Sequence, residues 1–346
     1  MRKFFTWLAV SFVVLLLIVW ATLFYYQEPI RAFIEKQLNA NVQGYHFVIG
    51  KAHLYPNLSL ELKDVVMIQT DHPEPPVANL PKWRFSIQWR HILSGKLVSD
   101  YLIERPTLYI TLPQAQKEIQ DKVPIHKKGW RDGVYSFYPI DINEFKVVDA
   151  DVTYVDQDPS RPLHLTHLNF RAGNIRNIHF PDDSYPSDIN FMGNIFGSGR
   201  IRLDGHANFL SEPSAGIDAN IALDQVPLEH LLPVTGRYNV HLRGGILSAD
   251  GHLEYTPDGE AEANFKNLTI ENVRIDYVHS PATLNREARV AKATAATAKK
   301  LHNKPETQIK IEHAVIKNSE FGYINETVKP PYRAFLSKAE LRLNNI

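Results

Sequence analysis

The sequence predicts a mainly β protein in which an N-terminal transmembrane helix is followed by a long, curled antiparallel β-sheet. One surface helix is expected near residues 281–302. Three observations predict this fold: an uncharged apolar run at the start of the chain, apolar and polar side chains that alternate through many later segments, and an Ala-rich and Lys-rich stretch near the end. With 346 residues, of which 44% are hydrophobic and 22% charged, the chain has enough apolar material for a folded core.

The first element is a membrane anchor over residues 4–26. About 23 residues from Phe4 to Tyr26 carry no charge, which is long enough for a helix to cross a bilayer. Arg2 and Lys3 precede this run, and a cationic flank favours the cytoplasm, so residues 1–3 form a cytoplasmic tail and the rest lies outside. A cleaved signal peptide is the alternative, but its apolar region is shorter and ends in small residues. We therefore predict an uncleaved, single-pass anchor.

The second element is a short amphipathic helix over residues 27–40. Ile30, Phe33, Ile34 and Leu38 follow helical spacing, and Pro29 suits a first helical turn. This helix is expected to seat the domain formed by residues 41–346 on the membrane.

Strands with one apolar and one wet face follow, because the period of the pattern falls to two. The apolar positions of four such segments are Leu58, Leu60 and Leu62; Phe85, Ile87 and Trp89; Leu108, Ile110 and Leu112; and Ile217, Ala219, Ile221 and Leu223. Ser59, Glu61 and Lys63 occupy the wet face of the first segment. The polar stretch from Pro113 to Gly133 is expected to be a loop, and Pro281 to His302 a surface or capping helix.

The chain resembles itself. Residues 145–158 align with residues 314–327, so that Asp149 falls opposite Asn318, and the segments ending at Ile175 and Ile346 align as well. A weaker third copy begins near Ile246. The last copy stops where the first continues, so we expect either a truncated sequence or an unprotected edge that can pair with another chain.

Several classes of function are excluded by composition and motif. Lys plus Arg equals Asp plus Glu at 38 each, so no charge excess draws the chain to nucleic acid. Cysteine is absent, which excludes disulfides, thiol catalysis and thiolate metal sites. The histidines are scattered, and no zinc-protease, phosphate-loop or serine-hydrolase motif occurs. We therefore predict no catalytic residues, no metal and no cofactor.

One acidic cluster offers an enzymatic alternative. It consists of Asp149, Asp151, Asp156 and Asp158. A D-x-D pair in a single-anchor luminal protein would suit a glycosyltransferase that holds a divalent cation. Since the second copy has Asn and Glu at the corresponding positions, a solvated strand and turn is the favoured interpretation.

The anchor and four later segments suggest a family. The anchor, the segment "NLSLELKDVVM" from Asn57 and the segment "FSIQWRHILSGKLVSDYLIERPTLYI" from Phe85 resemble the opening module of AsmA-like proteins, especially the DUF748 branch. The segments "FYPIDINEFKVVDADVTYVD" and "KPPYRAFLSKAELRLNNI" are similar to that branch too. The resemblance implies a periplasmic repeating β-groove, anchored in the inner membrane of a Gram-negative cell, that serves outer-membrane biogenesis and carries phospholipid acyl chains.

Two functions of different classes follow. The first is binding or transfer of membrane phospholipid in an apolar groove, with an envelope protein as a further partner through the open sheet edge. Its candidate lining residues are Leu58, Leu60, Leu62, Phe85, Ile87, Trp89, Leu108, Ile110 and Leu112. The second is a structural or regulatory envelope protein whose apolar faces close on each other, because a groove and a closed sandwich share the same alternation.

Overall fold

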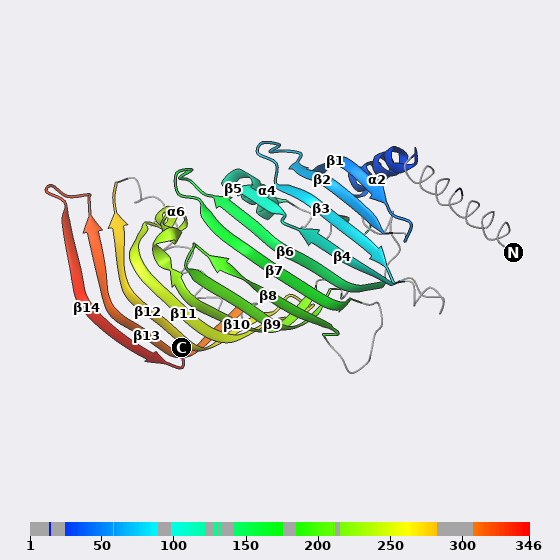
Figure 1. The fold of residues 1–346 in the computed structure, drawn as a ribbon. Helices are drawn as coiled ribbons and strands as arrows, with labels where there is room; N and C mark the ends of the chain where they lie inside the picture. Colours follow the sequence, from blue (N-terminus) through cyan, green and yellow to red (C-terminus); the bar gives the residue numbers. More distant parts are fainter. Residues whose placement is uncertain are drawn as a thin grey trace. The chain divides into compact units, whose positions relative to one another are not determined.

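The structure is a computed structural model that describes residues 25–57, 59–88, 98–121, 128–130, 132, 141–175, 185–209, 211, 215–281 and 307–346, together with Val14. It is mainly β, with one large mixed sheet of 14 strands and few helices (Figure 1). The strands follow the order β1-β2-β3-β4-β6-β7-β8-β9-β10-β11-β12-β13-β14, and β5 pairs with β3 and β6 off this path.

The elements have the following bounds. The strands are β1 (Tyr45–Leu54), β2 (Leu60–Gln69), β3 (Ala78–Ile87), β4 (Val98–Glu104), β5 (Thr107–Thr111), β6 (Asp141–Val155), β7 (Leu163–Ile175), β8 (Ser187–Ile195), β9 (Gly199–Asn208), β10 (Gly216–Pro227), β11 (Val240–Tyr255), β12 (Ala261–His279), β13 (Thr307–Asn325) and β14 (Tyr332–Asn344). The helices are α2 (Gln27–Asn41), α4 (Leu112–Gln120), α6 (Leu232–Thr235) and the 3-10 turns η2 (Leu228–Leu231) and η3 (Gly236–Tyr238).

The chain divides into two compact units. The first unit contains Met1–Val152 and Phe170–Asn177, and the second contains Thr153–Asn169 and Ile178–Ile346.

The expectation of a purely antiparallel sheet is wrong at two places. β4 runs parallel to β6, and β12 runs parallel to β13, whereas the other pairs with a known register are antiparallel. A parallel pair requires a long crossover between its strands, and the chain has one before β6 and one before β13. Alternation of side chains reports which face is buried but not the direction of a neighbouring strand, so the sequence pattern could not reveal these crossovers.

The first unit has a closed core beneath α2. Ile34 and Leu38 are the buried residues of this helix, and they pack with β1 to β4 in one cluster. Trp130 covers the same cluster, with its ring 5.1 Å from Tyr45 and 5.7 Å from Phe47. α2 spans the range predicted for the amphipathic helix, and the packing of its apolar stripe explains its stability.

α4 occupies part of the polar stretch for which the sequence predicts a loop. Thr111 and Gln114 form a capping box, and Pro113 stands in the first turn, where a missing N–H costs nothing. Leu112 is therefore the first residue of a helix rather than the end of a strand. The sequence T-L-P-Q carried this signal, but the polar composition of the following residues concealed it.

Backbone geometry supports the internal repeat. Non-glycine residues with positive φ occur at Asp149, His167 and Asn174 in the first copy. The aligned residues Asn318, Lys338 and Asn345 of the second copy also have positive φ. Such a conformation is uncommon outside glycine and marks an irregularity in the ladder, so three coincidences indicate the same strand geometry in both copies.

Three predictions lie largely outside the described residues. They are the span over residues 4–26, of which only Val14, Tyr25 and Tyr26 are described, the helix near 281–302, of which only Pro281 is described, and the positions of Leu58 and Trp89. Among the helices in the described ranges, none is both long and apolar enough to span a membrane.

Candidate functional site

The predicted groove residues lie in the first unit, and most of them belong to its closed core. Leu60, Leu62 and Phe85 are buried in the cluster beneath α2, where Leu62 and Phe85 have no exposed surface. Ile87 and Ile110 pack against this cluster and are partly buried. Leu108 is partly buried in β5, and Leu112 is partly buried at the start of α4. Their role in lining a lipid groove stays a prediction. In the first unit, the neighbours of these residues are the protein's own side chains.

The second unit has an apolar sheet face whose residues are not among the predicted groove residues. Cross-strand partners lie on the same face of a sheet, so the registers of β8 to β13 can be followed from strand to strand. One row contains Phe191, Leu203, Ile221, Gly251, Phe265 and Ile311. The rows on either side contain Ile189, Gly205, Ala219, Leu253, Ala263 and Ile309, and Gly193, Ile201, Leu223, Ala249, Leu268 and Ala314.

Small residues let neighbouring strands and side chains approach closely on this face. At Gly251, a Cβ atom would lie 2.8 Å from Phe265 Cα and 2.5 Å from the Asn264 carbonyl oxygen, so only glycine fits there. Gly205 and Ala219 face each other in the next row, where a Cβ on Gly205 would lie 2.7 Å from that of Ala219. The Phe265 ring packs over Gly251, because its Cδ1 would lie 3.0 Å from a Cβ atom added at Gly251.

Much of the face is accessible. Leu203, Ile221, Phe265 and Ile311 are only partly buried, in contrast to the completely buried residues of the first unit. Ile309 has 62% of its surface exposed. Within the described residues, the only helical cover comes from η2 and α6, where Leu228 and Leu231 pack on Leu242, Val273 and their neighbours.

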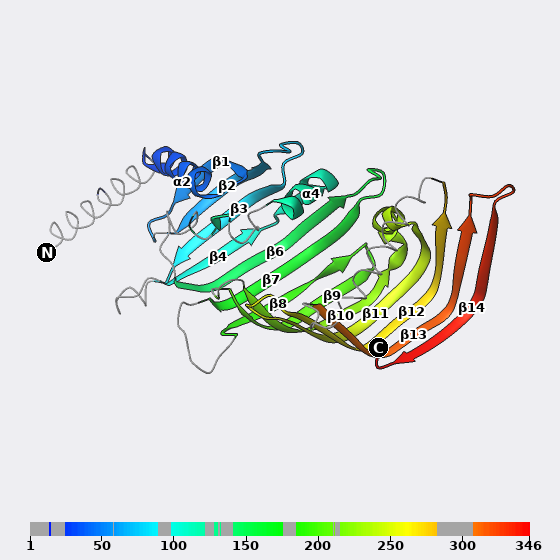
Figure 2. The ribbon, with the colours of Figure 1, turned by 180° about the vertical axis from the view of Figure 1, so that it is seen from behind.

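The strands of this unit are bent, and α6 lies on the inner side of the bend (Figures 1 and 2). The ladder of these strands is irregular: the register shifts between Leu223 and Val226 and between Ile316 and Ser319, and Asn272 has positive φ. A bulge bends its strand and increases the local twist. Because Leu228 belongs to the apolar cluster next to α6, the apolar face is the inner one.

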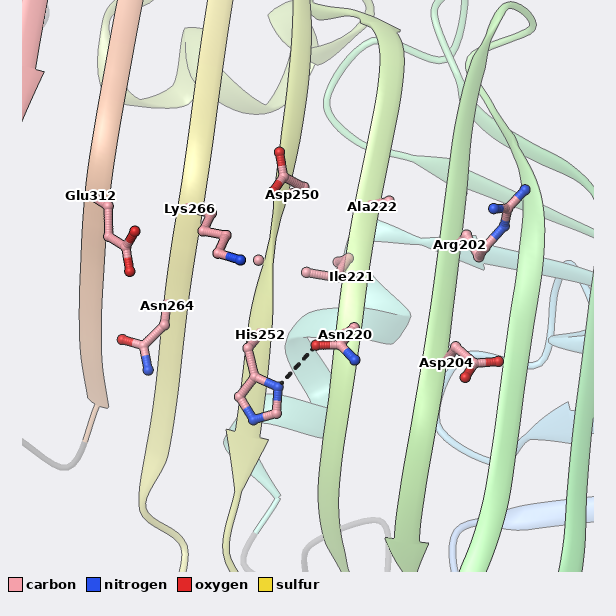
Figure 3. Close-up of a pocket in the computed structure, with 11 residues that line it drawn as sticks. Arg202, Asp204, Asn220, Ile221, Ala222, Asp250, His252, Asn264, Lys266 and Glu312 are labelled. Atoms are coloured by element: carbon pink, nitrogen blue, oxygen red, sulfur yellow. Dashed lines mark hydrogen bonds between the residues drawn. The ribbon is translucent and has the colours of Figure 1, made fainter.

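The opposite face of the same strands is polar. It holds a depression of about 440 Å³, lined by residues of β9 to β13 that include Arg202, Asp204 and Lys266 (Figure 3). The side chains bond along the face: Asn190 donates to Asp204 (2.9 Å), and His252 Nδ1 lies 3.2 Å from Asn220 Oδ1. This part of the sheet therefore separates a wet face from an apolar one, as the alternation predicted.

A buried carboxylate ties the last strands of the second unit together. Asp276 on β12 has no exposed side-chain surface and accepts hydrogen bonds from Arg274 Nε (2.9 Å) and Arg333 Nε (2.8 Å). Arg333 also bonds to Glu320. Burial alone would raise the pKa of Asp276, but the hydrogen bonds from Arg333 and Arg274 outweigh it, so the pKa lies below its usual value.

The first unit has a similar group at Glu61, which corrects its assignment to the wet face. Glu61 is buried and receives a hydrogen bond from Arg84 Nη2 at 2.8 Å. Arg84 is its cross-strand partner on β3, and Lys63 lies 3.3 Å away, so long cationic side chains cover the carboxylate. Burial opposes ionisation, but the bonds from Arg84 and Lys63 prevail and lower the pKa of Glu61.

These two carboxylates predict loss of stability in acid. A lowered folded-state pKa stabilises the fold above the unfolded pKa, and that stabilisation disappears as the pH falls through the folded-state pKa. We expect the urea midpoint to change little between pH 7 and pH 5 and to fall steeply below about pH 4. Asp276→Asn, which does not titrate, should reduce the acid dependence of the second unit. Identical pH profiles for the variant and the wild type would contradict this assignment.

The acidic cluster does not form a common site in the described residues. Asp156 is buried and is held by the Tyr154 hydroxyl (2.8 Å) and Arg237 Nη2 (3.1 Å). Asp158 accepts hydrogen bonds from Ser160 in the following turn, and Asp149 stands at an irregular point of β6. No group of three His, Asp or Glu side chains is placed to hold a metal ion in the ranges that the structure describes.

No family model fits the chain, and no curated protein matches its sequence.

Proposed function

We propose that the protein is a membrane-anchored, periplasmic β-groove protein that binds phospholipid acyl chains on the inner, apolar face of the second unit. The single observation that carries the proposal is the accessible apolar surface formed by three rows of side chains on β8 to β13. Contiguous apolar patches of this kind are rare on monomeric soluble proteins and mark binding surfaces.

Acyl chains suit this surface for a physical reason. It is long and narrow, because successive strands lie about 4.8 Å apart and each contributes one apolar residue or glycine to a row. Each methylene group that leaves water for such a surface gains about 0.8 kcal/mol. An extended hydrocarbon chain can follow a row over many strands, whereas a compact ligand would touch only a few.

The anchor, the periplasmic location in a Gram-negative inner membrane and the role in envelope biogenesis belong to the same proposal. They are supported by the uncharged run at residues 4–26, the cationic residues before it and the resemblance to AsmA-like proteins. A non-enzymatic role is part of the proposal as well.

The test is photocrosslinking to lipid in cells. With a photoreactive amino acid in place of Ile221 or Phe265, we expect crosslinks to phospholipid, because both side chains belong to the accessible apolar face. The matched controls carry the photoreactive amino acid at Asn220, which neighbours Ile221 but points to the polar face, or at Leu62 in the closed core of the first unit. Neither control should crosslink to phospholipid.

A second measurement uses the purified full chain. Native mass spectrometry should detect bound phospholipid, and Ile221→Glu together with Phe265→Glu should reduce its amount at least about tenfold. His252→Ala on the polar face is the control and should retain lipid. Equal crosslinking at Ile221 and Asn220, or lipid-free protein in every preparation, would favour the structural alternative.

A further inference from the structure

The two outer strands of the sheet differ in whether other parts of the chain bond to the backbone groups of their free edges. At β1, side chains of α2 bond to the backbone groups that a further strand would use. Asn39 Nδ2 donates to the Phe47 carbonyl (2.9 Å), and its Oδ1 accepts from the Phe47 N–H (2.7 Å). Two residues on, Glu35 accepts from the Ile49 N–H (2.8 Å), and Arg31 donates to the Ile49 carbonyl (3.0 Å). The edge of β1 is therefore already satisfied.

In the part of the chain that the structure describes, the edge of β14 has no such protection. β14 is the other outer strand, with 13 residues, and no described side chain bonds to its backbone. Alternate residues of an outer strand direct their N–H and C=O groups away from the sheet. Large apolar side chains accompany them: Leu336 is 64% and Phe335 58% exposed, and Leu341 and Leu343 are exposed as well.

We propose that β14 pairs antiparallel with β14 of a second copy of this chain, which gives a two-fold symmetric dimer. The register places Leu336 opposite Leu341 of the other copy and Ala334 opposite Leu343. Phe321 pairs with Leu336, Tyr323 with Ala334, Ile316 with Leu341 and Ala314 with Leu343. All four β14 residues are therefore on the apolar face, and the dimer continues that face from one copy to the next.

The opposite face is complementary in the same register. Phe335 lies opposite Arg342 of the other copy, where the guanidinium can cover the ring, as Arg333 already covers Phe335 within one copy at 4.6 Å from its centroid. Arg333 lies opposite Asn344, and Ser337 opposite Glu340, so like charges do not face each other. Lys338, which has positive φ, lies at the two-fold axis in each copy. The irregularity therefore falls between the two symmetric halves of the β14–β14 ladder and interrupts neither of them.

The protection of the β1 edge favours pairing between the β14 strands of two copies, because it prevents β14 from pairing with β1 of another copy. Addition of β14 to β1 of another copy would produce an open, head-to-tail polymer. The bonds from Asn39, Glu35 and Arg31 occupy the β1 edge, and exchanging them for a strand would require removal of α2 from its core. With that route blocked, β14-to-β14 pairing closes the assembly after two chains.

The experiment uses two full-length variants with different tags, Leu336→Cys and Leu341→Cys, expressed together. The wild-type chain has no cysteine, so each thiol is unique. In the proposed register these two positions are direct cross-strand partners, with Cβ atoms about 5 Å apart. Two Leu336 positions, or two Leu341 positions, are offset by five residues, or about 17 Å. Mild oxidation should therefore yield the mixed disulfide at least about fivefold in excess of either homodisulfide.

Two controls accompany the crosslinking. Leu336→Cys combined with Ala334→Cys should not crosslink, because these positions lie about 24 Å apart in the dimer. Leu336→Glu together with Leu341→Glu should abolish the dimer measured by sedimentation of the full chain in detergent, whereas Ile119→Glu, at an 83% exposed position on α4, should leave it intact.

Several results would overturn the proposal: a monomeric wild-type chain at micromolar concentration, homodisulfides as abundant as the mixed one, or a dimer that survives both glutamates. Capture of a different protein by β14 in place of a second copy would overturn it too. The outcome is independent of lipid binding, because crosslinking reports on β14 and lipid binding is measured at Ile221 and Phe265.

Discussion

Replacing Phe85 with alanine is expected to lower the free energy of unfolding of the first unit by about 3–5 kcal/mol. The ring has no exposed surface and packs against Trp83 and Tyr101, with centroids 4.8 and 5.0 Å away. Its removal leaves a cavity that the surrounding sheet and α2 cannot fill, because both are fixed by backbone bonds. Chemical denaturation, followed by the tryptophan fluorescence of the core, measures the change.

The control for Phe85 is Tyr109→Ala on β5, an aromatic residue that is 41% exposed and should cost less than about 1 kcal/mol. The same variants decide whether Phe85 contributes to lipid binding. If the ring acts only in the core, folded Phe85→Ala protein should retain its bound phospholipid at low temperature. Normal stability combined with loss of lipid would show instead that Phe85 belongs to the binding surface.

Gly322→Ala is expected to destabilise the second unit by about 3 kcal/mol or more. A Cβ atom at this position would lie 2.0 Å from Asp276 Oδ1 and 2.9 Å from Arg333 Nε. The methyl group therefore has to displace a carboxylate with no exposed surface from the arginine that neutralises it. Thermal unfolding monitored by circular dichroism measures the loss.

Two further variants separate this mechanism from a general effect of alanine. Gly236→Ala has no atom within 4 Å of the added methyl group and should leave the stability nearly unchanged. In the Asp276→Ala background the clash with the carboxylate is absent and only the flexible Arg333 side chain has to move, so Gly322→Ala should cost at least about 2 kcal/mol less than in the wild type. Additive effects of the two substitutions would contradict a direct conflict between the methyl group and the carboxylate.

The sequence predicted the class of fold because alternation is a local property. The pattern at Ile217, Ala219, Ile221 and Leu223 identified one face of β10 correctly, and the registers extend that face over the neighbouring strands. The same pattern at Leu60 and Leu62 looked identical, but α2 covers these residues. Which apolar face acquires a cover depends on contacts between distant segments, and periodicity contains no information about them.

Other structural features differ in how far the sequence could predict them. The capping box at Thr111 and Gln114 was readable in advance, whereas the parallel pairs of β4 with β6 and β12 with β13 were not. The burial of Glu61 could not be foreseen either, because it depends on Arg84 from the next strand. The protection of β1 by α2 follows from a helix and an edge that only the folded chain brings together.

The agreement of positive φ values between the two copies has a consequence for how such a protein can change in length. Asp149, His167 and Asn174 recur as Asn318, Lys338 and Asn345, so the irregular points belong to the module and are copied with it. A gene duplication that inserts a whole module would reproduce the curvature of the existing strands, whereas an insertion of arbitrary size would shift every irregular point. Length variants of this architecture are therefore expected to differ by complete modules, with the end capped by α2 kept constant.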